Sequence, residues 1–116
     1  MDLEKISKLL NTFAEERDWD QFHSVKNLSM ALSVEAGELM EIFQWMKEEQ
    51  TNQLASDPKV MSKVEEEVAD VFIYLMRIVN KLDIDLEKVT YAKMQKNAEK
   101  YPVELAKGNS KKYSDL

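Results

Sequence analysis

The sequence predicts an all-α protein, built as an antiparallel four-helix bundle with a short C-terminal helix and a tail. A chain of 116 residues is long enough for one hydrophobic core, but too short for two cores and a linker. Only two glycines and two prolines occur, too few for the turns of a multi-stranded β architecture. Apolar residues recur at the three- and four-residue intervals of a helix face. We therefore expect residues 1–116 to form a single domain.

Each helix follows from its apolar spacing and from the residues that can cap it. Ser24 is placed to cap the second helix, and Asp57 with Pro58 suits the start of the third. Asp85 is a candidate cap for the fourth. The expected long helices are residues 3–17, 25–49, 58–82 and about 86–100, and a short helix after Pro102 is stopped by Gly108. The polar tail, residues 109–116, is expected to be flexible.

Composition excludes several classes of function. The 16 basic and 22 acidic residues give a formal net charge of −6, which disfavours binding of nucleic acid. The absence of cysteine excludes disulfides, thiolate metal sites and thiol nucleophiles. No apolar run is long enough to span a membrane, and the first residues lack the apolar core of a signal peptide. We expect a cytoplasmic protein.

Two carboxylates stand where apolar residues belong. Glu35 interrupts the apolar stripe of the second helix, and Glu67 interrupts the matching stripe of the third. Each is followed three residues later by another acid, Glu38 or Asp70, so both members of a pair can reach one site. Burying an isolated carboxylate is costly unless a cation compensates it. The four acids together therefore predict a metal site between two helices.

The kind of ligand atom that these acids offer indicates which metal the site would prefer. Ligation by carboxylates without sulfur favours Mg²⁺, with Mn²⁺ as a possible substitute. A di-iron site would need histidine ligands on two helices, whereas His23 is the single histidine and lies outside both acid pairs. Gly37, inside the second helix, suggests close approach of a ligand or another backbone. The alternative is that such acids form an ordinary solvated helix face.

Three stretches of the chain resemble the MazG-like all-α nucleotide pyrophosphohydrolases, most closely their dCTP pyrophosphatase branch. The stretches are FAEERDWDQFHSVKNLSMALSVEAGELMEIFQW, EEEVADVFIYL and AKMQKNAEKYPVELAKGNSKKYSDL. The diagnostic pair of motifs appears as Glu35-Ala-Gly-Glu38 and Glu67-Val-Ala-Asp70. This resemblance implies Mg²⁺-dependent hydrolysis of a nucleoside triphosphate between the α and β phosphates, releasing the monophosphate and pyrophosphate. It also implies a homotetramer built as a dimer of dimers, or a homodimer.

The candidate site residues fall into three groups. The metal ligands are Glu35, Glu38, Glu67 and Asp70, with Glu38 or else Glu35 as the catalytic residue that activates water. The candidates for substrate binding are Trp19, His23, Asn27, Trp45 and Tyr74 on the nucleoside side, and Lys93, Asn97 and Tyr101 on the phosphate side. The resemblance supplies Trp19, His23, Lys93 and Asn97; Trp45 and Asn27 are expected on the helix face of Glu38. The alternatives are a core or dimer contact for Trp45, a surface or capping role for His23, and a core ring for Tyr74.

Two questions stay open at this point. Leu10 stands where the dCTP pyrophosphatases carry a histidine, which leaves the base preference open. The resemblance implies turnover of dCTP or of a modified deoxynucleotide; the alternatives are a dUTPase-like enzyme of the same superfamily and a non-catalytic helical interaction module.

Overall fold

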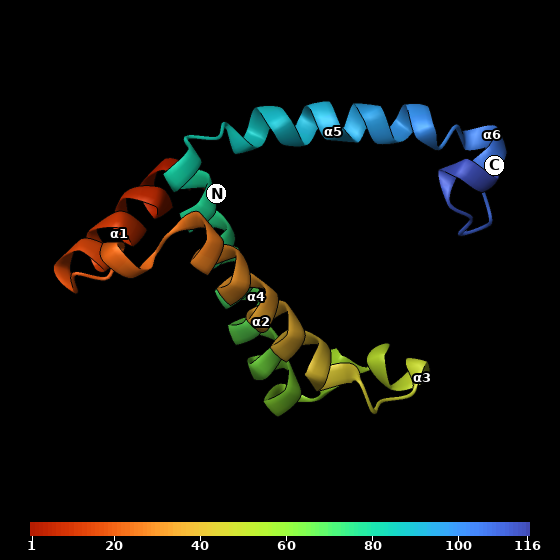
Figure 1. Cartoon of the computed structure of the whole chain (residues 1–116). Coiled ribbons are helices and arrows are strands. Elements are labelled where there is room, and N and C mark those ends of the chain that lie inside the picture. Colours follow the sequence, from red (N-terminus) through yellow and green to blue (C-terminus); the bar gives the residue numbers. More distant parts are fainter. The chain divides into compact units, whose positions relative to one another are not determined.

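The computed structural model describes residues 1–116 and contains helices and no strands (Figure 1). The all-α prediction is confirmed. The α-helices are α1 (Leu3–Glu16), α2 (Val25–Phe43), α3 (Glu48–Thr51), α4 (Pro58–Leu82), α5 (Leu86–Lys100) and α6 (Val103–Ala106). Three short 3-10 helices join or follow them: η1 (Asp20–Phe22), η2 (Leu54–Ser56) and η3 (Tyr113–Asp115).

The chain divides into two compact units, Met1–Leu82 and Asp83–Leu116. The first unit packs three long helices, α1, α2 and α4. The fourth long helix, α5, belongs to the second unit. Its apolar residues do not form a buried stripe, and none of its residues is buried.

The hydrophobic core of the first unit lies where its three long helices meet. Leu28 of α2 and Met76 of α4 are almost completely buried, and Ala14 of α1 and Val79 of α4 complete the buried apolar set. The most extensive helix contact is between α2 and α4, which run side by side (Figure 1). This pairing places the two interrupted apolar stripes against each other.

The capping predictions for the long helices are confirmed. The Ser24 side chain accepts a hydrogen bond from the backbone N–H of Asn27 at 3.1 Å, and Asp57 accepts one from Val60 at 3.3 Å. Asp85 caps α5 in the same way. These side chains satisfy backbone donors that the first helical turn leaves free, and so they set where each helix begins.

The predicted end of the second helix is wrong. α2 stops at Phe43 and not near Glu49. The backbone at Lys47 is extended, and its N–H donates to the side chain of Gln50 at 2.8 Å, which starts the separate helix α3. This local bond between a side chain and the backbone competes with continuation of α2.

In the second unit, the end of helix α5 contacts the C-terminal tail. Tyr113 packs edge-on against Tyr101, with ring centroids 6.2 Å apart. The ammonium group of Lys100 lies 4.8 Å from the centroid of the Tyr113 ring. Residues 109–116, expected as a flexible tail, thus include the turn η3.

None of the helices combines the length and the apolar character that crossing a bilayer requires.

Candidate metal and nucleotide site

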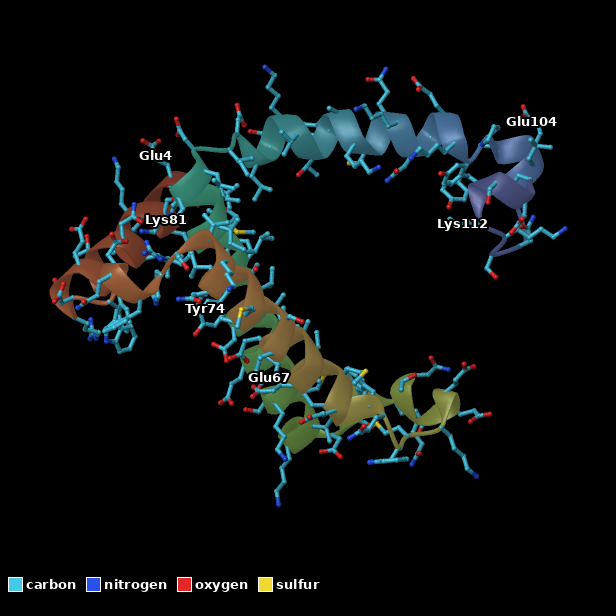
Figure 2. All side chains as sticks on the ribbon, viewed as in Figure 1. Glu4, Glu67, Tyr74, Lys81, Glu104 and Lys112 are labelled. Atoms are coloured by element: carbon cyan, nitrogen blue, oxygen red, sulfur yellow. The ribbon has the colours of Figure 1, made fainter.

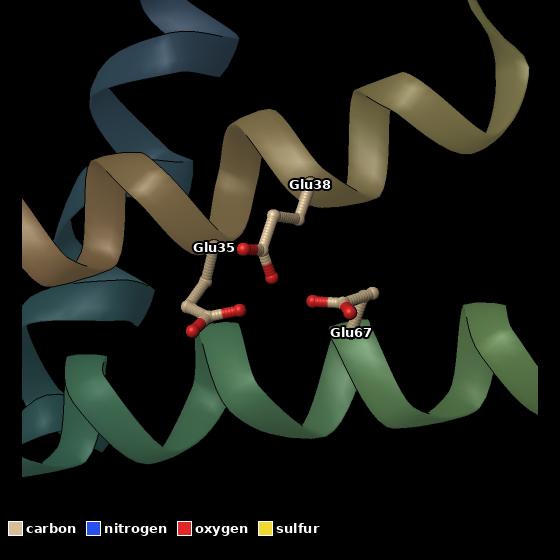
Figure 3. A group of neighbouring side chains, drawn as sticks. All are labelled: Glu35, Glu38 and Glu67. Carbon is tan, nitrogen blue, oxygen red and sulfur yellow. The ribbon is translucent and has the colours of Figure 1, made fainter.

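Three carboxylates meet between α2 and α4 (Figure 3). Glu35, Glu38 and Glu67 each offer one oxygen, and these oxygens all lie within 4.8 Å of one another. Glu35 and Glu38 share a face of α2 because they are three residues apart, and Glu67 reaches them from α4. The geometry predicted from the interrupted stripes is therefore present for three of the four acids.

The cluster is electrostatically unfavourable without a cation. Glu35 Oε2 and Glu67 Oε2 are buried and have no hydrogen-bond partner. Burial, followed by hydrogen bonding and charge repulsion from the neighbouring acids, raises the pKa of Glu35 to about 7. Burial also raises the pKa of Glu67. Unpartnered, crowded carboxylate oxygens of this kind suit a hard divalent cation, so the residues present fit a magnesium-type site.

The fourth predicted ligand, Asp70, is placed differently. It lies one turn beyond Glu67 on α4 and is half-buried. Its charge helps to raise the pKa of Glu35, which places it in the electrostatic field of the cluster. Its oxygens are not among the three that converge.

A row of polar residues continues from the cluster along α4. Glu67, Asp70, Tyr74, Arg77 and Lys81 follow one another at intervals of three and four, and therefore lie within about 80° of helix circumference. Figure 2 shows Glu67, Tyr74 and Lys81 in this order along the helix. Ten residues separate Glu67 from Arg77, which corresponds to about 15 Å along the axis. Tyr74, predicted to lie on the nucleoside side, is half-buried between the two ends of the row.

Trp19 and His23 lie together, as expected for residues of one site. Their rings are 6.2 Å apart, and Trp19 also packs edge-on against Phe13 at 5.7 Å. The turn at the end of α1 places Trp19 beside these rings, and in this turn Asp18 adopts a positive φ of 54°. The N–H groups of Asp18 and Trp19 then donate to the carbonyls of Glu15 and Ala14, a motif that ends a helix and reverses the chain.

Asn27 and Trp45 differ in their surroundings. The Asn27 side chain donates to the carbonyl of Phe22 at 3.0 Å, so it holds the segment η1 against the start of α2. Trp45 is not on the same helix face as Glu38, because α2 ends at Phe43. Its side chain is 89% exposed, which excludes the alternative of a core contact within the first unit.

The three predicted phosphate-side residues lie in the second unit. Lys93 and Asn97 are one turn apart on α5, and Tyr101 follows its last residue. All three are exposed.

The sequence reasoning missed Arg77, which is 4% exposed and is the buried charge of this unit. Its guanidinium donates to Asn11 Oδ1 of α1 at 2.6 Å and to Asp20 Oδ1 of η1 at 3.2 Å. Lys81 also binds Asp20. A signal was present in the sequence, because Arg77 is the single charge in the otherwise apolar run from Val71 to Val79.

Comparisons with known proteins identify the family of this chain. The model of the MazG-like family matches residues 30–116. Rat dCTP pyrophosphatase 1 is 43% identical over 98% of this chain and 67% of its own length, and the human protein of that name is 40% identical over the same shares. The crystal structure of a pyrophosphatase from Archaeoglobus fulgidus superimposes with a TM-score of 0.80 at 36% identity, covering 88% of this chain and 94% of that one. The chain belongs to the MazG-like family.

Proposed function

We propose that this chain is a nucleoside triphosphate pyrophosphohydrolase that converts a deoxynucleoside triphosphate, with dCTP as the first candidate, to the monophosphate and pyrophosphate. The observation that carries the proposal is the cluster of Glu35, Glu38 and Glu67 with its two buried, unpartnered oxygens. The names of the rat and human relatives support the substrate.

The carboxylates would hold Mg²⁺, with Mn²⁺ as a substitute. Glu35, Glu38 and Glu67 are the ligands that the geometry supports, and Asp70 is proposed as the fourth. A divalent ion bound there neutralises phosphate charge and makes water more acidic. Glu38 is the exposed member of the cluster, so it is best placed to orient water and accept its proton, with Glu35 as the alternative. The water oxygen bonds to the α phosphorus as the bond to the bridging oxygen breaks, and pyrophosphate leaves.

The nucleoside is assigned to the other end of the polar row on α4. Trp19, half-exposed and braced by Phe13, offers a ring face or edge to a base. His23 lies on the same segment as Trp19, and Asn27 of α2 holds that segment through its bond to the Phe22 carbonyl. Tyr74 stands between this region and the carboxylates. Lys93, Asn97 and Tyr101 remain the proposed phosphate-side residues. Trp45 follows the opposite end of α2, so as a nucleoside contact it would serve the site of a second copy.

Self-association is part of the proposal. Large apolar side chains of α2 and the turn after it are exposed in the single chain, at positions Met30, Val34, Met40 and Trp45. Gly37 lies on the same helix face as Met30 and Val34, and a Cβ built there would meet nothing within 4 Å. The close approach expected at Gly37 is therefore not made within the first unit, which supports a second copy covering this face in a homotetramer or a homodimer. Sedimentation velocity measures the state directly.

The decisive experiment is hydrolysis of a panel of deoxynucleoside triphosphates with Mg²⁺ in ¹⁸O-labelled water. We expect pyrophosphate as a product and the label in the nucleoside monophosphate, because attack is at the α phosphorus. Glu38→Gln should lower turnover by roughly 10² or more. Glu41→Gln, which changes an exposed acid of the same helix, should leave turnover unchanged.

Other outcomes separate the alternatives. Consumption of dUTP alone would identify the dUTPase-like enzyme. No turnover of any nucleotide, together with no stabilisation by Mg²⁺, would favour the non-catalytic module. Full activity of a folded Glu38→Gln protein would refute the assignment of the carboxylates.

A further inference from the structure

The contact between Arg77 and His23 restricts the protonation of the histidine ring. Arg77 Nη2 lies 3.4 Å from His23 Nδ1. A guanidinium group has only donors, so Nδ1 must act as the acceptor and carries no proton. In a neutral ring the proton is then on Nε2, at the other edge of the imidazole.

The groups around His23 also disfavour the doubly protonated ring. Partial burial lowers the pKa of His23, and the charges of Arg77 and Lys81 on α4 lower it further. Asp20 of η1 acts in the opposite direction, and Asn11, which reaches the same guanidinium from α1, is uncharged. These surroundings therefore favour the neutral ring.

Arg77 is a buried charge with one unsatisfied N–H group. Asn11 and Asp20 bind its two terminal nitrogens, whereas its Nε is buried without a partner. A buried guanidinium with an unsatisfied N–H is costly, and an apolar side chain at this site would avoid that cost. A function for the guanidinium accounts for its presence, and the ring nitrogen within its hydrogen-bonding reach is that of His23.

We propose that Arg77 is a positioning residue that fixes His23 as the tautomer protonated on Nε2, so that the ring presents a hydrogen-bond donor beside Trp19. Resting on the proposed function, this makes Arg77 a determinant of base selection. A fixed donor favours a base edge with an acceptor, such as N3 of cytosine. It disfavours an edge with an N–H group, such as N3 of uracil or thymine.

The test uses the fact that His23 is the only histidine in the chain. Long-range ¹H–¹⁵N correlation spectra of the ¹⁵N-histidine-labelled full chain report one pair of ring nitrogens without ambiguity. At pH 7 we expect a protonated Nε2 and an unprotonated Nδ1. Arg77→Met removes every donor, so the two tautomers should exchange and the chemical shifts of Nδ1 and Nε2 should move towards each other. Arg77→Lys should restore part of the separation between the two shifts. Lys81→Met removes a nearby charge but not the contact, so it should leave the tautomer unchanged.

Specific results overturn the proposal. A proton on Nδ1 in the wild-type protein refutes it before any variant is made, and so does a folded Arg77→Met protein with an unchanged ring spectrum. If Arg77→Met fails to fold, Asp20→Asn loosens the guanidinium at constant side-chain size and should shift the tautomer in the same direction.

The kinetic readout is separate from the spectroscopic one. Arg77→Met should narrow the preference in kcat/KM for dCTP over dUTP by about tenfold, mainly through KM. An equal loss of kcat for both nucleotides would refute the role in selection. An expected NMR result without hydrolysis of any nucleotide would refute the proposed function and leave the tautomer assignment standing.

Discussion

Replacing Glu35 by glutamine should stabilise the metal-free protein, because it removes one negative charge from a crowded cluster. In the folded chain the pKa of Glu35 is raised from its ordinary 4.5 to about 7. A carboxyl group with a raised pKa prefers to be protonated in the folded state. Its contribution to stability is therefore complete below pH 4.5 and is lost as the pH rises to 7 and above.

The size of the effect follows from the same shift. A rise from 4.5 to about 7 corresponds to at most about 3 kcal/mol of unfavourable ionisation free energy above pH 7. The side chain is partly exposed and shares its charge with its neighbours, so we expect about 1 to 2 kcal/mol. For a chain of this length that is a rise in Tm of roughly 5 to 10 °C for Glu35→Gln at pH 8.

Thermal unfolding in EDTA at pH 4.5 and pH 8 provides the assay. The variant should melt higher than the wild type at pH 8, and the two should melt at similar temperatures at pH 4.5, where the wild-type carboxyl group is protonated. Glu41→Gln on the same helix is the matched control, and its Tm should differ from that of the wild type by no more than about 2 °C at either pH. A Glu35→Gln protein that is less stable than the wild type at pH 8, or equally shifted at both pH values, would refute the reasoning.

Two further predictions concern metal binding and self-association. Mg²⁺ at about 100 times its Kd should raise the free energy of unfolding of the wild type by about 2.7 kcal/mol, and the Glu67→Gln protein should show little of this gain. Calorimetric melts measure the effect, and equal stabilisation of the two proteins would contradict the assignment of Glu67 as a metal ligand. Gly37→Ala should raise the free energy of unfolding of the single chain by up to about 1 kcal/mol, because the added Cβ meets nothing within 4 Å. Gly37→Leu should weaken self-association in sedimentation velocity if a second copy approaches there, whereas unchanged association would place the interface elsewhere.

Much of the local structure was predictable because its causes are local. The apolar spacing of α1, α2 and α4 and the caps at Ser24 and Asp57 depend on residues within one or two helical turns. The end of α2 was not predictable from spacing, because the bond from Lys47 to Gln50 competes with a helical pattern that continues past it. The division after Leu82 also depends on contacts that helix periodicity does not describe.

For the site, too, some features follow from the sequence alone and others depend on how the helices pack. The sequence by itself determined an all-helical chain and the two acid pairs that interrupt apolar stripes, since each pair is a property of one helix. Only the tertiary structure decided that oxygens of Glu35, Glu38 and Glu67 converge while no oxygen of Asp70 joins them, because convergence depends on the register between α2 and α4. The Arg77 network was likewise beyond the sequence: its partners Asn11, Asp20 and His23 lie more than fifty residues away in the chain, and only packing of α1 and η1 on α4 brings them together.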